Sequence, residues 1–205
     1  MTKVIELDEQ YSFTDCKPFC GKSSGRCQYF LYGSNLNLKQ LQARCSRPKA
    51  LGVARLPNHR IGFYGYSKIW DGAIETAVPE SGRDLWGVIY ELSYSDGEQL
   101  DSWQDARLDG SGAYFHYPTS VVDVSGNRFG VILYKKDIQE TPQTPSREYL
   151  DFILQGAREQ GLPEEFIQEL KKTATHPATY SVPKTPKFNL GLLGGHCSDC
   201  QKENP

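Results

Sequence analysis

The sequence has no long hydrophobic run and no excess of positive charge. None of its apolar segments approaches the roughly 20 residues that a membrane-spanning helix needs. Its first residues, MTKVIELDEQ, carry acids where a signal peptide would carry an apolar core. The net charge is -2, and lysines and arginines are scattered instead of forming a stripe that would neutralise phosphates. We therefore expect a cytoplasmic protein with no nucleic-acid partner and no membrane partner.

The sequence also has no internal repeat and no low-complexity block. Its 205 residues suit one large or two small domains, and a hydrophobic content of 38% can fill a core. Short runs rich in Val, Ile, Tyr and Phe, separated by Gly and Pro, predict strands at 28–32, 52–66, 72–77, 85–92, 112–124 and 129–135.

The periodicity changes after these strands. Thr144 and Pro145 suit a helix start, and apolar residues then recur at helical spacing until Gly161. Pro163 opens a second predicted helix. Strands followed by helices favour an α+β domain, with a mostly antiparallel sheet or a small barrel.

The stretch YFLYGSNLN, residues 29–37, begins as an apolar strand and ends in Gly33-Ser34-Asn35. A turn explains these residues, because glycine and asparagine tolerate left-handed backbone angles. A second interpretation is that successive backbone N–H groups form a cradle for a carboxylate or a developing oxyanion. The residues of this stretch alone leave both interpretations open.

Several segments together resemble the gamma-glutamylcyclotransferase family in order and spacing. They are YFLYGSNL, GVARLPNHRIGFYG, WDGAIETAVPESGRDLWGVIYEL, LDSWQDARLDGSGAY and TPSREYLDFILQGAREQGLPEEFIQELKK. The resemblance covers roughly residues 28–175 and implies a small, mostly antiparallel β-barrel with flanking helices. We therefore divide the chain into an N-terminal extension (1–27), a gamma-glutamylcyclotransferase-like domain (28–175) and a C-terminal tail (176–205).

The resemblance implies a reaction that needs no cofactor. The α-amine of a small γ-glutamyl substrate attacks its own γ-carbonyl, which yields 5-oxoproline and releases an amine or amino acid, as in glutathione metabolism. The resemblance also implies that the substrate cradle consists of Tyr32, Gly33, Ser34, Asn35 and Leu36, and that Tyr114, Tyr134 and Tyr149 make further substrate contacts. A homodimer is compatible with this resemblance.

The family's proton carrier is a glutamate in a Leu-Asp-x-x-Glu-Gly motif, but the corresponding segment here reads LDSWQDA. Gln104 stands at the glutamate position, and an amide cannot titrate. Asp105 is the substitute that we favour as the catalytic base; Asp109 is the second candidate, and Glu75 and Glu98 rank behind them. The alternatives are a related amide-cleaving or acyl-transfer enzyme with another acyl group, or a ligand-binding protein without catalysis.

The cysteines form a second group of candidate ligands. Cys16 and Cys20 lie near the start of the sequence, and Cys197 and Cys200 lie near its end. Two close pairs of thiolates can build a tetrahedral zinc site, with His196 or Cys27 as replacement ligands. Such a zinc ion would be structural, because four protein ligands leave no position for water. The alternatives are free thiols, with one pair redox-active, or disulfides, which a reducing cytoplasm disfavours.

Overall fold

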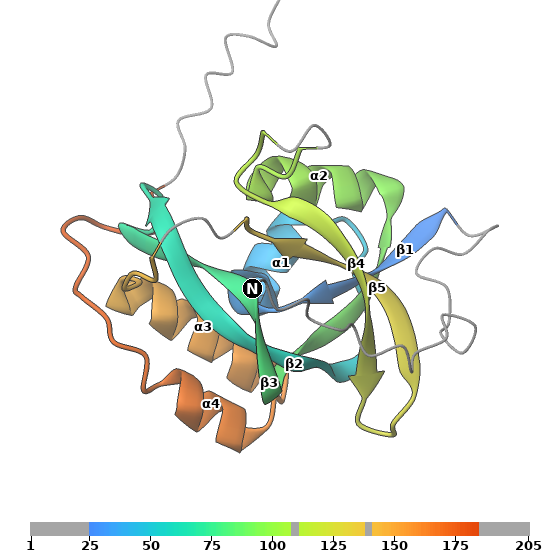
Figure 1. Cartoon of the computed structure of the whole chain (residues 1–205). Coiled ribbons are helices and arrows are strands. Elements are labelled where there is room, and N and C mark those ends of the chain that lie inside the picture. The colour runs from blue at the N-terminus through green and yellow to red at the C-terminus, as the bar shows by residue number, and fades with distance from the viewer. Residues whose placement is uncertain (1–24, 108–110, 138–140, 185–205) are drawn as a thin grey trace, which may run out of the picture.

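The structure is a computed structural model that describes residues 25–107, 111–137 and 141–184. The described residues form one closed barrel with strand order β1-β3-β2-β4-β5 (Figure 1). The strands are β1 (Arg26–Leu31), β2 (Lys49–Ser67), β3 (Gly72–Ser93), β4 (Phe115–Asp123) and β5 (Arg128–Lys135). All strand pairs are antiparallel except β1 with β5, which confirms the predicted small, mostly antiparallel barrel.

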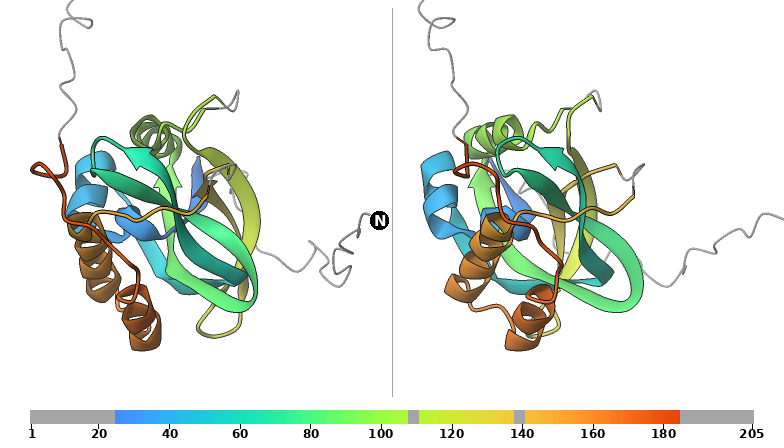
Figure 2. Two further views of the ribbon diagram at one scale, coloured as in Figure 1. Left: turned by 60° about the vertical axis from the view of Figure 1, so that its left-hand side comes forward. Right: turned by 90° about the vertical axis from the view of Figure 1, so that its left-hand side faces the viewer.

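The two longest strands differ from the predicted ones. β3 continues from residue 72 to residue 93, whereas the sequence indicated two strands separated by a turn. The turn signals instead produce an irregularity in the β2–β3 pairing, where Pro57 pairs with Asp84 but His59 pairs with Pro79. Residues 80–83 of β3 are therefore extra residues opposite Asn58, and the strand continues through this shift in register. Figure 2 shows β2 and β3 as one long curved pair of ribbons.

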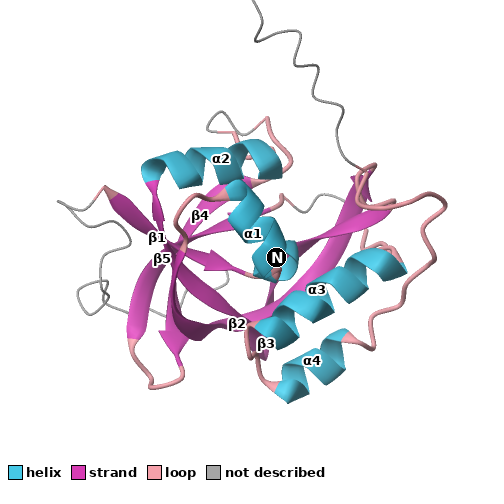
Figure 3. Cartoon of the chain, turned by 180° about the vertical axis from the view of Figure 1, so that it is seen from behind, coloured by secondary structure: helices cyan, strands magenta, loops and turns pink. Residues whose placement is uncertain are grey.

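Four α-helices and a short 3-10 turn complete the described part of the chain. The turn is Gly33–Leu36, and the helices are α1 (Leu38–Arg44), α2 (Tyr94–Gln104), α3 (Arg147–Glu159) and α4 (Glu164–Leu170). In Figure 3, α1 lies between α2 and the α3–α4 pair. The two predicted helices are present, but Ser146, not Thr144, caps α3, because its side chain accepts from the Tyr149 N–H group.

Helix α3 packs directly on the 3-10 turn. A β-carbon added at Gly156 would lie 2.6 Å from the backbone nitrogen of Asn37 and 2.9 Å from the β-carbon of Leu36. Only glycine permits this close approach. The Asn37 side chain in turn accepts from the Gln40 N–H group and caps α1. The 3-10 turn is therefore held between α1 and α3.

Residues 176–184, the first part of the predicted tail, lie against the turn between β2 and β3. Asp71 accepts hydrogen bonds there from the Thr179 N–H group at 2.5 Å and from the Thr179 hydroxyl at 2.7 Å. The Lys184 N–H group donates to the Ile69 carbonyl at 2.8 Å. Pro183 and Lys184 of this segment line a cavity beside the Gly33–Leu36 turn, which we call the main cavity. Among the described residues, no helix is long and apolar enough to cross a membrane.

Candidate active site

The predicted cradle is a buried turn that faces a buried carboxylate. Gly33 has a φ of +68°, and a β-carbon at this position would lie 2.3 Å from Oε1 of Glu75. The Ser34 N–H group donates to the same oxygen at 2.9 Å. The Ser34 N–H group of the turn is thus bonded to a carboxyl group of the protein itself, and the cradle for substrate stays a prediction.

Glu75 comes from β3 and is only 3% exposed. Its Oε1 also accepts from the Ser34 hydroxyl at 3.1 Å, and its Oε2 accepts from the Tyr149 hydroxyl. Burial raises the pKa of Glu75 above its ordinary value, although these hydrogen bonds act in the opposite direction. No ion pair of Glu75 is found within the described ranges, so this carboxylate relies on neutral donors.

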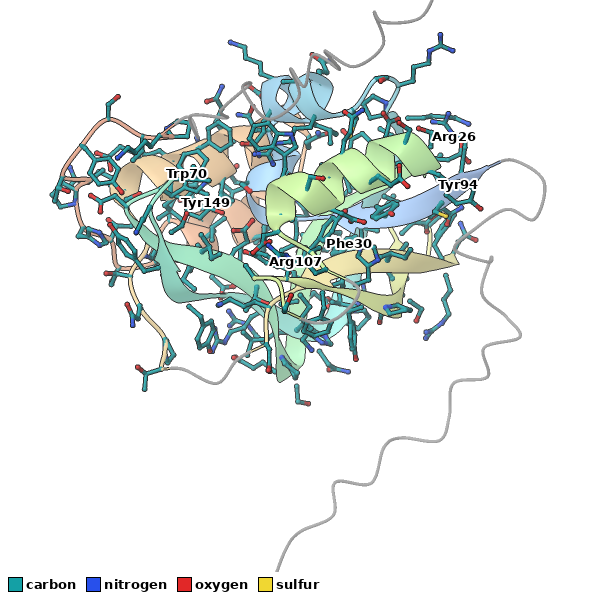
Figure 4. All side chains as sticks on the ribbon, turned by 90° about the horizontal axis from the view of Figure 1, so that it is seen from above. Arg26, Phe30, Trp70, Tyr94, Arg107 and Tyr149 are labelled. Carbon is teal, nitrogen blue, oxygen red and sulfur yellow. The ribbon has the colours of Figure 1, made fainter. Side chains whose placement is uncertain are left out.

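A cavity of about 320 Å³ opens beside the turn. This volume is within the range of small-molecule sites. Ser34 and Tyr149, the two residues that bind Glu75, line it, and Trp70 lies against Tyr149 with ring centroids 4.5 Å apart (Figure 4). The rest of its lining is Gln40, Ala43, Arg44, Ser67, Ile69, Ile74, Trp103, Gln104, Asp105, Ala113, Tyr114, Pro183 and Lys184. The cavity is thus largely apolar, with a few polar groups on its wall.

Arg44 places a positive charge on this wall. Its guanidinium donates to the Asn35 side-chain oxygen at 3.0 Å and lies 4.7 Å from the centre of the Trp103 ring. Burial lowers the pKa of Arg44, whereas Tyr149 and Glu75 act to raise it. A guanidinium remains charged in proteins and suits carboxylate recognition. The arrangement can therefore bind the carboxylate of a ligand.

The tyrosines predicted to contact substrate fall into two groups. Tyr114 and Tyr149 line the main cavity, where the Tyr114 hydroxyl donates to the backbone carbonyl of Glu75 at 2.7 Å. Tyr32 and Tyr134 lie deeper in the barrel. The Tyr32 hydroxyl donates to the Tyr134 carbonyl at 2.5 Å, and the Tyr134 hydroxyl donates to Asp101 at 2.6 Å. Leu36 is fully buried in the core.

Asp105 lies at the rim of the main cavity, directly after α2. Its backbone is left-handed, with a φ of 48°, and its side chain is 53% exposed. The carboxylate accepts from Arg107 Nε at 3.0 Å and from the Ala113 N–H group at 3.2 Å. Asp105 is thus engaged by a cation and a backbone group in solvent. Asp109 lies outside the described residues.

A second, small cavity lies inside the barrel. Its lining includes Gln104 and Glu75 together, with Tyr114 also contributing to the main cavity. The other lining residues are Phe30, Leu31, Tyr32, Asn35 and Tyr134. The carboxylate of Glu75 therefore borders the same space as the amide at the position of the family glutamate.

The sequence interpretation ranked Glu75 behind Asp105 and Asp109, whereas the structure buries it against the Gly33–Leu36 turn. Its signal was an acid within the apolar strand segment GAIETAV, where alternation could have directed it outward. The four cysteines of the predicted zinc site, Cys16, Cys20, Cys197 and Cys200, lie outside the described residues. Zinc binding therefore stays a prediction.

The described barrel has the architecture of solved relatives, and a family model matches part of the chain. The model of the AIG2-like family matches residues 84–170. A solved structure of a gamma-glutamyl cyclotransferase superimposes with a TM-score of 0.71 at 30% identity, covering 77% of this chain and 93% of that one. YkqA of Bacillus subtilis, at 22% identity and a TM-score of 0.62, shares the fold.

Comparison with curated proteins narrows this class. The gamma-glutamylcyclotransferase of Mus musculus is 30% identical over 171 residues, which cover 82% of this chain and 88% of the mouse protein. That of Homo sapiens is 30% identical over 170 residues, covering 81% and 87% of the two chains. The chain belongs to the gamma-glutamylcyclotransferase family.

Proposed function

We propose that this protein cyclises a γ-glutamyl compound to 5-oxoproline and releases the attached amine or amino acid. The observation that supports this proposal is a cavity of ligand size that opens beside the Gly33–Leu36 turn, with a titratable carboxylate behind its wall. The family relatives carry the name of this activity. The reaction needs no cofactor, because the substrate supplies both its nucleophile and its electrophile.

The cavity wall suits the two ends of the γ-glutamyl group. Arg44 binds the α-carboxylate through its guanidinium, which Asn35 and Trp103 hold in place. The chain of the substrate then folds so that its α-nitrogen approaches its γ-carbonyl. Holding such a geometry is worth an effective molarity of roughly 10⁵–10⁸ M in well-oriented intramolecular reactions.

The γ-carbonyl oxygen becomes an oxyanion in the tetrahedral intermediate and needs a donor. The Ser34 N–H group, which donates to Glu75 in the structure, serves as that donor once it leaves Glu75. The α-ammonium must lose a proton before it can attack, so the site also needs a base. Asp105 at the rim and Glu75 behind the wall are the two described carboxylates that meet this need.

Ligand binding without turnover is the second candidate function. Two observations favour it: Gln104 cannot titrate, and the Ser34 N–H group is already bound to Glu75. A protein of this kind would hold a γ-glutamyl compound in the main cavity and release it unchanged. Cytoplasmic location and the homodimer remain further proposals.

The test is incubation of the full chain with a panel of γ-glutamyl amines and γ-glutamyl peptides, followed by mass spectrometry. Formation of 5-oxoproline with equimolar release of the amine supports cyclisation. Calorimetric binding of a panel member without 5-oxoproline supports the second function. Neither binding nor product from any member contradicts both.

A further inference from the structure

Glu75 is a buried acid whose direct hydrogen-bond donors are all neutral, with the Arg44 guanidinium near enough to act on it electrostatically. Glu75 is 3% exposed, and none of the ion pairs found in the described part of the chain includes it. Burying an acid with only neutral partners destabilises a protein. Such groups occur preferentially at functional sites, where a shifted pKa serves the chemistry.

The position of Glu75 relates it to the missing proton carrier. Gln104 stands where the family pattern has its glutamate, and Gln104 and Glu75 line one small cavity. Gln104 comes from the end of α2, whereas Glu75 comes from β3. Glu75 therefore lines the same small cavity as Gln104 but comes from a different element and a different part of the sequence.

We propose that Glu75 is the general base of the cyclisation and takes over the role of the glutamate that the family has at the position of Gln104. This inference rests on the proposed function. Both hydroxyls that bind the carboxylate, those of Ser34 and Tyr149, belong to residues of the main cavity. An α-ammonium group that enters between these two residues contacts the carboxylate, which makes Glu75 a catalytic residue.

The protons balance with Glu75 as the carrier. The ionised carboxylate takes one proton from the α-ammonium, and the freed amine attacks the γ-carbonyl carbon to form the new C–N bond. Glu75 gives this proton to the leaving nitrogen as the old C–N bond breaks. It then takes the second proton from the ring nitrogen and passes it to the released amine, which departs as an ammonium. Glu75 ends ionised, as it began.

The contact between Glu75 and the cradle links proton transfer to oxyanion binding. While Glu75 is ionised, its Oε1 holds the Ser34 N–H group in a charge-assisted hydrogen bond. Protonation of Glu75 removes that charge and weakens the bond. The N–H group is thereby released to the substrate oxygen when the oxyanion forms. Before substrate binds, Glu75 therefore occupies the Ser34 N–H group of the cradle.

Asp105 fits this role less well than Glu75. Its side chain is 53% exposed, and Arg107 Nε already donates to it at 3.0 Å. The carboxylate thus lies in solvent at the rim, with its oxygens already held by donors from its own loop. Asp105 instead closes the turn after α2 by accepting from the Ala113 N–H group.

The experiment compares steady-state turnover of the best γ-glutamyl substrate by the wild-type chain, Glu75→Gln and Asp105→Asn. Glu75→Gln keeps size and polarity but cannot titrate, so kcat should fall by roughly 10²–10⁴-fold with little change in KM. Asp105→Asn tests the competing base and should keep far more turnover than Glu75→Gln if Glu75 carries the proton. A third variant, Asp151→Asn, is the matched control: it changes an exposed acid of α3 outside both cavity linings and should stay within about threefold of wild type. Melting curves confirm that all three variants are folded.

A further variant gives a readout that a structural role would not produce. Tyr149→Phe keeps the packing on Trp70 but removes the donor to Glu75 Oε2. This hydrogen bond lowers the pKa of Glu75, so its loss should move the acidic limb of the pH–rate profile to higher pH. The other ionisable groups around Glu75 are Tyr114, Tyr32 and Arg44, which this variant retains.

The possible results distinguish the role of Glu75 from the proposed cyclisation on which it rests. An active wild type with full turnover in Glu75→Gln overturns the assignment of Glu75 and leaves the cyclisation intact. Loss of turnover in Asp105→Asn alone returns the role to Asp105. A wild type that forms no 5-oxoproline from the panel removes the function and this inference with it. An unmoved acidic limb in Tyr149→Phe also contradicts the role of Glu75.

Discussion

Substituting Gly33 by alanine tests the contact between the cradle and Glu75 through protein stability. Gly33 has a φ of +68°, and its added β-carbon would lie 2.3 Å from Glu75 Oε1. Gly126 has a φ of +86° with no atom within 4 Å of such a β-carbon, so Gly126→Ala is the matched control. The two glycines share a left-handed backbone and differ in the neighbouring carboxylate.

The expected magnitudes follow from this difference. A non-glycine residue in the left-handed region costs about 1–2 kcal/mol, which is all that Gly126→Ala should lose. Gly33→Ala must also displace Glu75 from the Ser34 N–H group, and a hydrogen bond to a charged group contributes about 1.5–3 kcal/mol. Its total should be about 3–5 kcal/mol, or roughly 6–20 °C in melting temperature at ~2–4 °C per kcal/mol.

Thermal and urea unfolding followed by circular dichroism measure these losses. The same Gly33→Ala substitution is then made in a Glu75→Ala background, where no carboxylate meets the new β-carbon. The penalty there should fall to about 1–2 kcal/mol, leaving a coupling of about 2–3 kcal/mol between the two positions. Equal penalties in both backgrounds would refute the contact that places Glu75 against the cradle.

Four further predictions concern substrate binding, folding, pH and zinc. In steady-state kinetics, Arg44→Gln should raise KM for γ-glutamyl substrates by about tenfold or more with kcat nearly unchanged. A fall in kcat of about tenfold with KM unchanged would contradict a role of Arg44 in substrate binding. Ser146→Ala removes the cap of α3 and the donor to the Trp70 carbonyl at 2.5 Å, so it should lower the free energy of unfolding in urea by about 1–3 kcal/mol. A loss below about 0.5 kcal/mol would exclude this capping role. Because burial raises the pKa of Glu75, the folded chain binds this proton more tightly than the unfolded chain; wild type should lose stability relative to Glu75→Gln as pH rises from below 4.5 towards 8, and a pH-independent difference in melting temperature speaks against it. Purified protein should contain about one zinc ion per chain, and Cys197→Ser should lower both the zinc content by elemental analysis and the melting temperature, whereas metal-free protein of equal stability excludes the site.

The sequence determined the barrel and much of its cavity. Alternating apolar residues between Gly and Pro turns indicated most of the strands, and helical spacing after Pro145 indicated α3 and α4. These signals are local, because periodicity reports directly which side of an element is buried. The turn at Gly33-Ser34-Asn35 was also predictable, because glycine and asparagine tolerate left-handed backbone angles, but its sequence alone left open whether the turn serves as a cradle.

The carboxylate of the site depended on tertiary structure. Asp105 was favoured because it adjoins Gln104 in the sequence. Its own left-handed backbone after α2 places its side chain at the solvent-exposed rim, beside Arg107. Glu75 is 29 positions away from Gln104 in the numbering of the chain, yet the two line the same small cavity. Sequence proximity places residues along an element, whereas barrel closure decides which residues from different strands and helices meet. The partners of Glu75 come from the 3-10 turn and from α3, and only packing of α3 on that turn brings their donors to one carboxylate.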